Sequence, residues 1–326
     1  MPKILVENLT KTFQIAERSP GFWGALKGVV HRRYRTIKAL DDVSFSIEPG
    51  ELVGYIGPNG AGKSTTVKII SGILVPDSGR CEIGGLVPWE SRTEHVNGIG
   101  VVFGQRTQLW WDLPVIESFD LLKDIYRIPE DRYASSREGM IERLNLGSLL
   151  DVPVRQLSLG QRMRCDLAAS LLHEPDLLFL DEPTIGLDAV SKLAVRDFVR
   201  HLNREHTVTV ILTTHDMDDI EALCTRVMVI GDGSILSDGT IGDLRSRVSS
   251  ERRLIVDLER EGETISDESA EVVSQEGHRV ELSFNPDETS AAELIGRITA
   301  KHPVRDLFVE NPPIEEIIAR IYGERS

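Results

Sequence analysis

The strongest chemical signal in this sequence is the stretch 57–64, GPNGAGKS. It fits the pattern G-x-x-x-x-G-K-[ST], in which the glycines let backbone N–H groups wrap a phosphate. In such a loop, Lys63 would reach the terminal phosphates of a nucleotide and the hydroxyl of Ser64 would bind Mg²⁺. A strand-like run precedes the loop and a helical pattern follows it, so a nucleotide-binding loop is favoured over a glycine-rich turn.

Two carboxylates end an apolar run at 177–182, LLFLDE. Taken alone, the pair could simply mark the solvent-facing end of a strand. Beside a phosphate loop, Asp181 is suited to hold Mg²⁺ through a water, and Glu182 is placed to polarise the attacking water as general base. The phosphate loop therefore favours the catalytic interpretation.

Gln105 and His215 each follow an apolar run of the kind buried in parallel sheets, as Glu182 does. A lone glutamine is more typical of a solvated surface, and a lone histidine here is more typical of a helix start. In an open α/β sheet, however, ligands bind beyond the carboxyl ends of the strands. We expect these distant residues to converge with Ser64 on one γ-phosphate, which predicts nucleoside triphosphate hydrolysis.

A second helix end is also suited to an anion. In the stretch LSLGQ, Ser158 and Gln161 fit the S-x-x-Q capping box that begins a helix. The free N–H groups at such a helix end favour a negative charge. The apolar spacing i, i+4, i+8 that follows predicts a half-buried helix, with Met163, Leu167 and Leu171 on its buried face.

The elements that must position these residues follow an α/β pattern. Alternating strands are predicted at 3–7 and 43–47, and a helix is predicted over 65–73, after the phosphate loop. Residues 106–172 are helical in pattern with little strand character, which indicates a helical insert. Short apolar runs typical of buried parallel strands occur at 52–56, 99–103, 177–180, 208–212 and 227–230.

The length of 326 residues allows one large domain and one small domain. We expect the large domain to span 1–240 and to end after the hairpin GDGSILSDGT. Residues 241–252 are expected to link the two domains, with 241–250 as either a helix or an irregular linker. Residues 253–326 alternate short strand patterns with two helical patterns, which predicts a small α+β accessory domain.

Composition excludes several classes of protein. The net charge of −15 argues against nucleic-acid binding through the overall field. No apolar run is long enough to span a membrane, and the first residues have a strand pattern rather than that of a signal peptide. The three cysteines form no CxxC pair and indicate a reduced, cytosolic protein. Residues 18–38 carry six Lys or Arg and no Asp or Glu, so this basic insertion is suited either to an anionic membrane surface or to a plain extended loop.

Taken together, these motifs resemble those of the ATP-binding subunits of ABC transporters, over about residues 1–240. GPNGAGKST is similar to their P-loop, LSLGQ to their LSGGQ signature, and LLFLDEP to their acidic strand end. Residues 186–188, GLD, resemble their D-loop, while Gln105 resembles their Q-loop and His215 their switch histidine. The resemblance implies a P-loop NTPase fold of the ABC type, with a mixed sheet core, an antiparallel N-terminal β subdomain and a helical insert.

The resemblance also implies roles within one subunit, with ATP and Mg²⁺ as the bound pair. Glu182 would be the general base, His215 would hold the γ-phosphate, and Gln105 would sense Mg²⁺ and the water. The metal would be held by Ser64, Gln105 and Asp181. The nucleotide contacts would come from Gly57, Pro58, Asn59, Gly60, Ala61, Gly62, Lys63, Ser64 and Thr65.

In that family two subunits pack head to tail, and the Ser-x-Gly of each subunit caps the γ-phosphate that the other's P-loop holds. Here the cross-dimer contacts would come from Ser158, Gly160 and Gln161, with Asp188 reaching the partner from the D-loop. Leu159 stands where the family has the first glycine of its signature. The phosphate contacts at this helix end would therefore depend on the Ser158 hydroxyl and the Gly160 backbone.

Four aromatic residues bear on the subtype and on adenine recognition. Phe13, in KTF, matches the family position for stacking on adenine, and it is preferred to Tyr34, which lies nearer the next strand. Trp110 and Trp111 follow the Q-loop, where they could form a socket for a permease or fill the core of the helical insert. We expect the socket for one of the two rings.

The segment VFGQRTQLWWDLPV resembles the corresponding segment of a bacterial subgroup that pairs with ABC-2-type permeases and is usually assigned to export. The implied partners are a second ATPase subunit, identical or a sister chain, and membrane-spanning permease subunits. The implied location is the cytoplasmic face of the inner membrane, in peripheral contact with it.

Three alternatives are weaker. Soluble relatives that act on DNA or ribosomes carry a long coiled coil, zinc-binding cysteines or tandem nucleotide domains, and the sequence has none of these. A non-hydrolysing relative is disfavoured by the presence of both Glu182 and His215. An importer ATPase is the closest rival, but its usual regulatory tail is longer and barrel-like.

Overall fold

The computed structural model describes residues 3–17, 33–104, 106–248 and 251–323. The chain divides into two compact units, Met1–Asp238 and Gly239–Ser326, which are called the first unit and the second unit below. Within the described residues, no helix has the length and apolar character needed to cross a bilayer.

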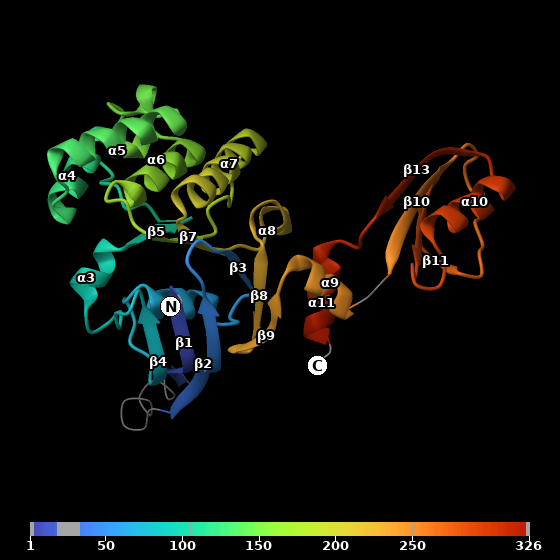
Figure 1. The fold of residues 1–326 in the computed structure, drawn as a ribbon, viewed down its shortest axis with the longest axis horizontal. Coiled ribbons are helices and arrows are strands. Elements are labelled where there is room, and N and C mark those ends of the chain that lie inside the picture. Colours follow the sequence, from blue (N-terminus) through green and yellow to red (C-terminus); the bar gives the residue numbers. More distant parts are fainter. Residues whose placement is uncertain (1–2, 18–32, 105, 249–250, 324–326) are drawn as a thin grey trace, which may run out of the picture. The chain divides into compact units, whose positions relative to one another are not determined.

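A six-stranded sheet forms the centre of the first unit (Figure 1). Its strands are β3 (Leu52–Ile56), β5 (Ile99–Phe103), β6 (Leu177–Asp181), β7 (Thr209–Thr213), β8 (Arg226–Gly231) and β9 (Ser234–Gly239). They lie in the order β5-β6-β7-β3-β8-β9, and the first five pair in parallel. A two-residue turn, Asp232-Gly233, with φ of 47° and 76°, leads from β8 into β9. Because four of the parallel strands precede loops with predicted site residues, those loops meet at one edge of the sheet.

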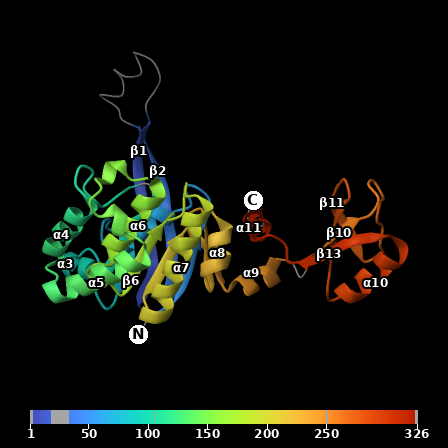
Figure 2. The ribbon, with the colours of Figure 1, turned by 90° about the horizontal axis from the view of Figure 1, so that it is seen from above.

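An antiparallel sheet forms a second layer of the first unit. It has the order β2-β1-β4, with β1 at Ile4–Glu17, β2 at Arg33–Ile47 and β4 at Ser78–Ile83. Figure 2 shows β1 and β2 side by side along their whole length. The two strands are far longer than the predicted segments 3–7 and 43–47. Residues 33–38, placed in the basic insertion by the sequence, pair with β1 as part of β2, and residues 18–32 lie outside the described part of the chain.

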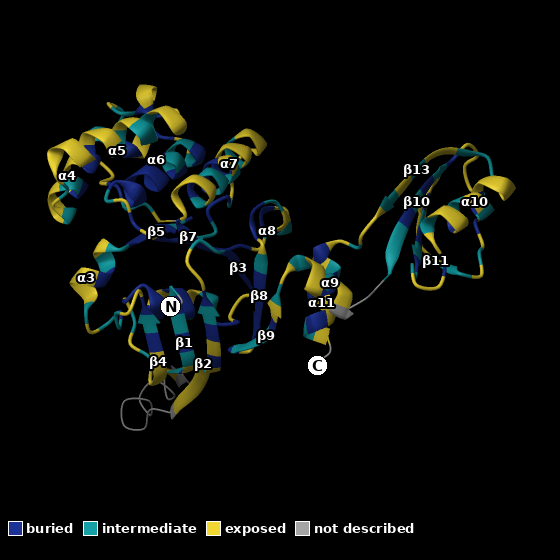
Figure 3. Cartoon of the chain, viewed as in Figure 1, coloured by how far each residue is buried: buried dark blue, intermediate teal, exposed yellow. Residues whose placement is uncertain are grey.

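The main core lies between these two sheets and around helix α2 (Lys63–Ile70). Tyr55 of β3 is 1% exposed, and Ile69 and Ile70 of α2 are equally inaccessible. Figure 3 shows the central strands β3 and β8 in the colour of buried residues. Burial of this apolar surface stabilises the unit and fixes where the phosphate loop, between β3 and α2, can lie. Helix α3 (Arg92–Asn97) leads into β5 and packs against it.

A helical segment lies between β5 and β6, as the sequence predicts. It contains α4 (Val115–Tyr126), α5 (Glu130–Arg143), the short 3₁₀ helices η1 (Gly147–Leu149) and η2 (Val154–Gln156), and α6 (Leu159–Leu171). In α6 the predicted apolar face is buried, with Met163, Leu167 and Leu171 at most 3% exposed. Two further helices follow β6 and β7, namely α7 (Ala189–His206) and α8 (Met217–Leu223).

The second unit is a four-stranded antiparallel sheet with helices, in agreement with the predicted α+β class. Its elements are α9 (Ile241–Val248), β10 (Arg252–Leu258), β11 (Ala270–Glu276), β12 (Arg279–Phe284), α10 (Ala291–Lys301), β13 (Val304–Glu310) and α11 (Ile314–Gly323). The core of this sheet includes Leu254, Leu282 and Leu294, all fully buried. Of the two possibilities left open for residues 241–250, the structure has the helix, α9, whose Leu244 is buried and which packs on α11.

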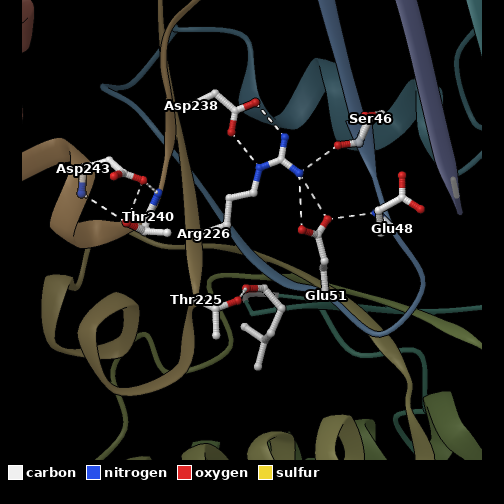
Figure 4. A network of polar contacts seen from close by, with 9 residues as sticks. Ser46, Glu48, Glu51, Thr225, Arg226, Asp238, Thr240 and Asp243 are labelled. Atoms are coloured by element: carbon white, nitrogen blue, oxygen red, sulfur yellow. Dashed lines mark hydrogen bonds and ion pairs between the residues drawn. The ribbon is translucent and has the colours of Figure 1, made fainter.

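Arg226, at the start of β8, joins three segments of the first unit (Figure 4). Its Nε and Nη2 atoms each donate to the carboxylate of Asp238 on β9 at 2.7 Å. Its Nη1 atom donates to the carbonyl oxygen of Ser46 at 2.9 Å and to Glu51 at 3.1 Å. One guanidinium therefore ties β8 to β9, to the end of β2 and to the turn between β2 and β3.

Candidate active site

The phosphate loop has a backbone that only glycine allows at its key positions. Gly62, which precedes α2, has a φ of 111°, and a Cβ atom there would lie 2.5 Å from the carbonyl oxygen of Ala39. No side chain caps α2, so the first N–H groups of this helix remain available to a ligand. The loop is thus built to bring backbone donors close to an anion.

Lys63 points back over this loop. Its ammonium donates to the carbonyl oxygens of Gly57, at 2.5 Å, and Pro58, at 3.1 Å. Burial lowers the pKa of Lys63, and the negative charges of Glu182 and Asp181 oppose part of that shift. The cation and the two carboxylates therefore share one electrostatic environment, although they are more than a hundred residues apart in the sequence.

A cavity of about 420 Å³ lies over the loop. It brings the phosphate loop together with Asp181 and Glu182, as the strand-end argument predicts. Arg106 and Lys68 also line it, and the sequence analysis missed both residues. Lys68 follows Ser64 at helical spacing, so a search for cations on the loop-facing side of the helix could have found it. The full lining is Ala39, Pro58, Asn59, Gly60, Gly62, Lys63, Ser64, Thr65, Lys68, Phe103, Gly104, Arg106, Asp181 and Glu182.

Glu182 meets His215 across two neighbouring strand ends. The Oε1 atom of Glu182 lies 3.3 Å from Nδ1 of His215, whose side chain is 67% exposed. The N–H of Glu182 donates to the carbonyl oxygen of Thr213 at 2.8 Å, and the Thr213 hydroxyl donates to Asp181. Glu182 has a φ of 53°, a left-handed conformation that is strained for a residue with a side chain. Gln105 lies outside the described residues.

The donor set present fits Mg²⁺. The hydroxyl of Ser64 is exposed at the start of α2, and the Asp181 carboxylate lines the same cavity. Hard oxygen donors, few in number, are typical of Mg²⁺ sites that also use phosphate oxygens and waters. Among the described residues there is no cluster of three or more His, Cys, Asp or Glu side chains of the kind that zinc requires.

The Ser158 helix end has the predicted capping box. The N–H of Gln161 donates to the Ser158 hydroxyl at 3.2 Å, and the N–H of Ser158 donates to the Gln161 side chain at 2.9 Å. Leu159 packs on the D-loop, because its side chain lies 2.9 Å from where a Cβ atom of Gly186 would be. Within the described part of the chain, the Ser158 helix end does not line the 420 Å³ cavity.

Asp188 caps the next helix, α7. Its carboxylate accepts from the N–H of Ser191 at 2.9 Å and from the Ser191 hydroxyl at 2.8 Å. The hydrogen bonds from Ser191 hold the pKa of Asp188 below its usual value. The same serine closes over Gly160, where a Cβ atom would lie 2.6 Å from the Ser191 hydroxyl. The D-loop and the Ser158 helix end are therefore in direct contact.

The strand register favours Phe13 over Tyr34 as the aromatic residue near the nucleotide. Ala39 lines the cavity, and Phe13 pairs with Ile37 of the same strand. At about 3.3 Å per residue, Ile37 lies roughly 7 Å along β2 from Ala39, whereas Tyr34 lies roughly 16 Å away. Phe13 is 39% exposed, so its ring is accessible to a ligand. Its stacking on adenine stays a prediction.

The two tryptophans after the predicted Q-loop lie at the surface. Trp110 is 38% exposed and Trp111 is 51% exposed, which rules out the alternative that both rings fill the core of the helical insert. The Arg162 guanidinium lies 5.6 Å from the centre of a Trp111 ring. Leu109, just before them, is the residue that enters the core.

Known proteins are similar to this chain over much of its length. The family model described as "ABC transporter" matches residues 40–185. The linearmycin resistance ATP-binding protein LnrL of Bacillus subtilis is 31% identical over 302 residues, which are 90% of this chain and 96% of that protein. The daunorubicin resistance ATP-binding protein DrrA3 of Streptomyces coeruleorubidus is 37% identical, over 68% of this chain and 69% of that protein.

Two further comparisons differ in coverage. The probable multidrug ABC transporter ATP-binding protein YbhF of Escherichia coli is 35% identical over 68% of this chain, but this chain spans only 38% of its length. A dimeric, post-hydrolysis structure of the ATP-binding cassette MJ0796 bound to ADP and Pi is similar with a TM-score of 0.60 and 26% identity, over 73% of this chain and 98% of that one. By its motifs, its fold and these relatives, the chain belongs to the family of ABC transporter ATP-binding proteins.

Proposed function

We propose that this chain is the ATP-binding and ATP-hydrolysing subunit of an ABC exporter with an ABC-2-type permease. The observation that carries the proposal is the 420 Å³ cavity, which places the phosphate loop, Lys63, Asp181 and Glu182 around one volume. His215, which does not itself line the cavity, contacts Glu182, which does. Triphosphate binding and water activation are the chemistry that such a set supports.

The residues divide the work of phosphoryl transfer. Loop N–H groups and Lys63 bind and orient the phosphates, with Ser64 and Asp181 as the ligands that would hold Mg²⁺. The metal would neutralise charge on the phosphate oxygens. Glu182 accepts the proton of the attacking water, and His215 holds both Glu182 and the γ-phosphate in place. Gln105, which directly follows Gly104 in the sequence, would complete the contacts to the metal and the water.

The cross-subunit role of the second helix end has structural support. Ser158 is exposed at this helix start, whereas Gln161 is half-buried and Gly160 is buried, and none of the three lines the described part of their own cavity. On α7, after Asp188, Val190 is 77% exposed and Leu193 is 57% exposed. Exposed apolar residues beside an anion-binding helix end are suited to a second ATPase subunit. ATP is then held between the phosphate loop of one subunit and the Ser158 helix end of the other.

The transport role rests on the relatives and on the surface of the helical segment. Linearmycin and daunorubicin resistance are the printed roles of two of the relatives described above. Trp110 and Trp111 offer aromatic surface to a permease. The subunit would work at the cytoplasmic face of the inner membrane, in peripheral contact with it, and without nucleic acid.

A substitution at Glu182 tests the ATPase proposal. The purified chain should hydrolyse Mg²⁺–ATP, and Glu182→Gln should abolish turnover while ATP-bound dimers accumulate, because the amide cannot accept the proton. Phosphate release and size-exclusion chromatography with ATP measure the two effects. Undiminished hydrolysis in the variant would remove Glu182 from the role of base. A wild-type chain without ATPase activity, alone and with its permease, would overturn the proposal.

A further inference from the structure

The contact between Glu182 and His215 needs support from elsewhere in the chain. Glu182 holds a strained left-handed backbone conformation, and the His215 side chain is two-thirds exposed, so the position of each depends on groups elsewhere in the chain. A residue keeps such a strained conformation only when contacts with the surrounding structure hold it there. The side chains that follow Glu182 and His215 in the sequence are placed to give this support.

Five side chains behind the pair form a closed polar cluster, called here the α7–α8 clamp. It consists of Thr184, Lys192, Arg196, Asp216 and Asp219. Thr184 is two residues beyond Glu182, and Asp216 directly follows His215. The two cations lie on α7, and Asp219 lies on α8. The clamp thus joins the loop after β6 to the loop after β7 through one helix.

Asp219 is the centre of the clamp. Its side chain is 0% exposed, and it accepts from the Thr184 hydroxyl and, at 2.5 Å, from Nε of Arg196. A carboxylate buried this completely depends on its partners, since an unpaired buried charge is strongly unfavourable. The geometry of Thr184, and so of the loop that begins at Glu182, is thereby fixed relative to α8.

Asp216 forms the second half of the clamp. It accepts from the ammonium of Lys192, and its Oδ1 atom lies 3.6 Å from Nη2 of Arg196. Burial raises the pKa of Asp216, but Lys192 and Arg196 outweigh it and hold the pKa below its usual value. The N–H of Asp216 also donates to the Thr214 hydroxyl at 3.0 Å, so the backbone on both sides of His215 is constrained.

We propose that the α7–α8 clamp consists of positioning residues, which hold Glu182 against His215 for ATP hydrolysis. The inference rests on the ATPase function proposed above. Arg196 is the most informative member, because it contacts the carboxylates of both Asp216 and Asp219. Without it the two loops lose their common anchor, while the phosphate loop, which lies at a different helix, keeps its own geometry.

The test separates turnover from binding. Arg196→Met should lower kcat at least about tenfold and leave the Kd for ATP unchanged, because misplacement of catalytic groups affects the chemical step. Arg196→Lys keeps the positive charge but cannot contact two carboxylates with separate N–H groups of one guanidinium. Its kcat should lie between that of the wild type and that of Arg196→Met. Thr184→Val and Lys192→Met remove single contacts and serve as milder variants if Arg196→Met does not fold.

Arg200→Met is the matched control. Arg200 lies one turn further along α7 and also reaches α8, through the carbonyl oxygen of Ala222 at 3.0 Å, but it does not touch Asp216 or Asp219. Its kcat should equal that of the wild type. A cycle with His215→Ala adds a readout that a merely structural role would not move, since the loss from Arg196→Met should shrink when the histidine is absent.

The outcomes are distinct. Wild-type kcat in Arg196→Met and in both milder variants would overturn the clamp, as would loss of ATP binding in parallel with kcat, or full additivity in the His215→Ala cycle. A wild-type chain that binds ATP without hydrolysing it would instead refute the proposed function.

Discussion

Gly104 sits where the ends of β5 and β6 come closest, which makes it a sensitive probe of the site. A Cβ atom at this position would lie 2.0 Å from the carbonyl oxygen of Glu182, whereas real Cβ contacts stay above 3.0 Å. Gly104→Ala must therefore move the two strand ends apart by about 1 Å. Its N–H donates to the carbonyl oxygen of Asp181 at 2.7 Å, and that bond is lost or lengthened at a cost of about 1 kcal/mol.

The larger effect falls on turnover. A misplacement of about 1 Å in a catalytic group can cost on the order of 10²-fold in rate. This corresponds to about 2.7 kcal/mol of lost transition-state stabilisation at 1.36 kcal/mol per tenfold. We therefore expect Gly104→Ala to lower kcat for Mg²⁺–ATP hydrolysis about 100-fold. Phosphate release under saturating ATP measures kcat, and chemical denaturation measures the stability.

A glycine in an open environment gives the control. Gly139 lies in α5, and a Cβ atom there would meet nothing within 4 Å. Gly139→Ala should leave kcat unchanged and stabilise the helix by up to about 1 kcal/mol. A folded Gly104→Ala protein with wild-type kcat would show that the tight approach of β5 to Glu182 is not needed for hydrolysis, and it would refute the geometric argument for the site.

Two further predictions concern the second helix end and a buried carboxylate. Ser158→Arg should abolish hydrolysis but leave the Kd for ATP of the same chain unchanged; weaker ATP binding in a titration would contradict a cross-subunit role for this serine. Asp166 is 4% exposed, and burial raises its pKa to about 6. Because its pKa in the folded state exceeds the usual 3.8, the charged form destabilises the fold above about pH 6, and this penalty fades as the pH falls toward 4. Asp166→Asn, which can still accept from Thr107, should therefore raise the free energy of unfolding at pH 8 by up to about 3 kcal/mol, with no gain near pH 4, as urea denaturation at both pH values would show.

Features set by short-range spacing could be predicted from the sequence. The capping box of Ser158 and Gln161 depends on residues three apart, and the structure has both of its hydrogen bonds. The approach of Lys63 to the two carboxylates at the end of β6 depends on distant residues, yet it followed from a general rule for parallel sheets.

Features that depend on distant packing could not be predicted. Residues 33–38, RYRTIK, mix charged, polar and apolar side chains without strict alternation, so nothing in the sequence indicated that they pair with β1. The acidic residues after His215 are typical of a solvated helix start, yet Asp219 is fully buried, because Arg196 from another helix neutralises it there. Arg106 lines the cavity, but it lies in the loop after β5, and the sequence predicts where that strand ends without predicting where the loop side chains point.

The bidentate contact of Arg226 with Asp238 anchors the last residue of the first unit to β8. A chain that ended after Gly239 would retain this contact and all of β9. A chain that ended two residues earlier would leave the Arg226 guanidinium without the Asp238 carboxylate. Helix α9 begins just beyond, with its own packing partner in α11. The short segment between Asp238 and α9 is thus the point at which a different accessory domain could be fused without disturbing the sheet that carries the phosphate loop.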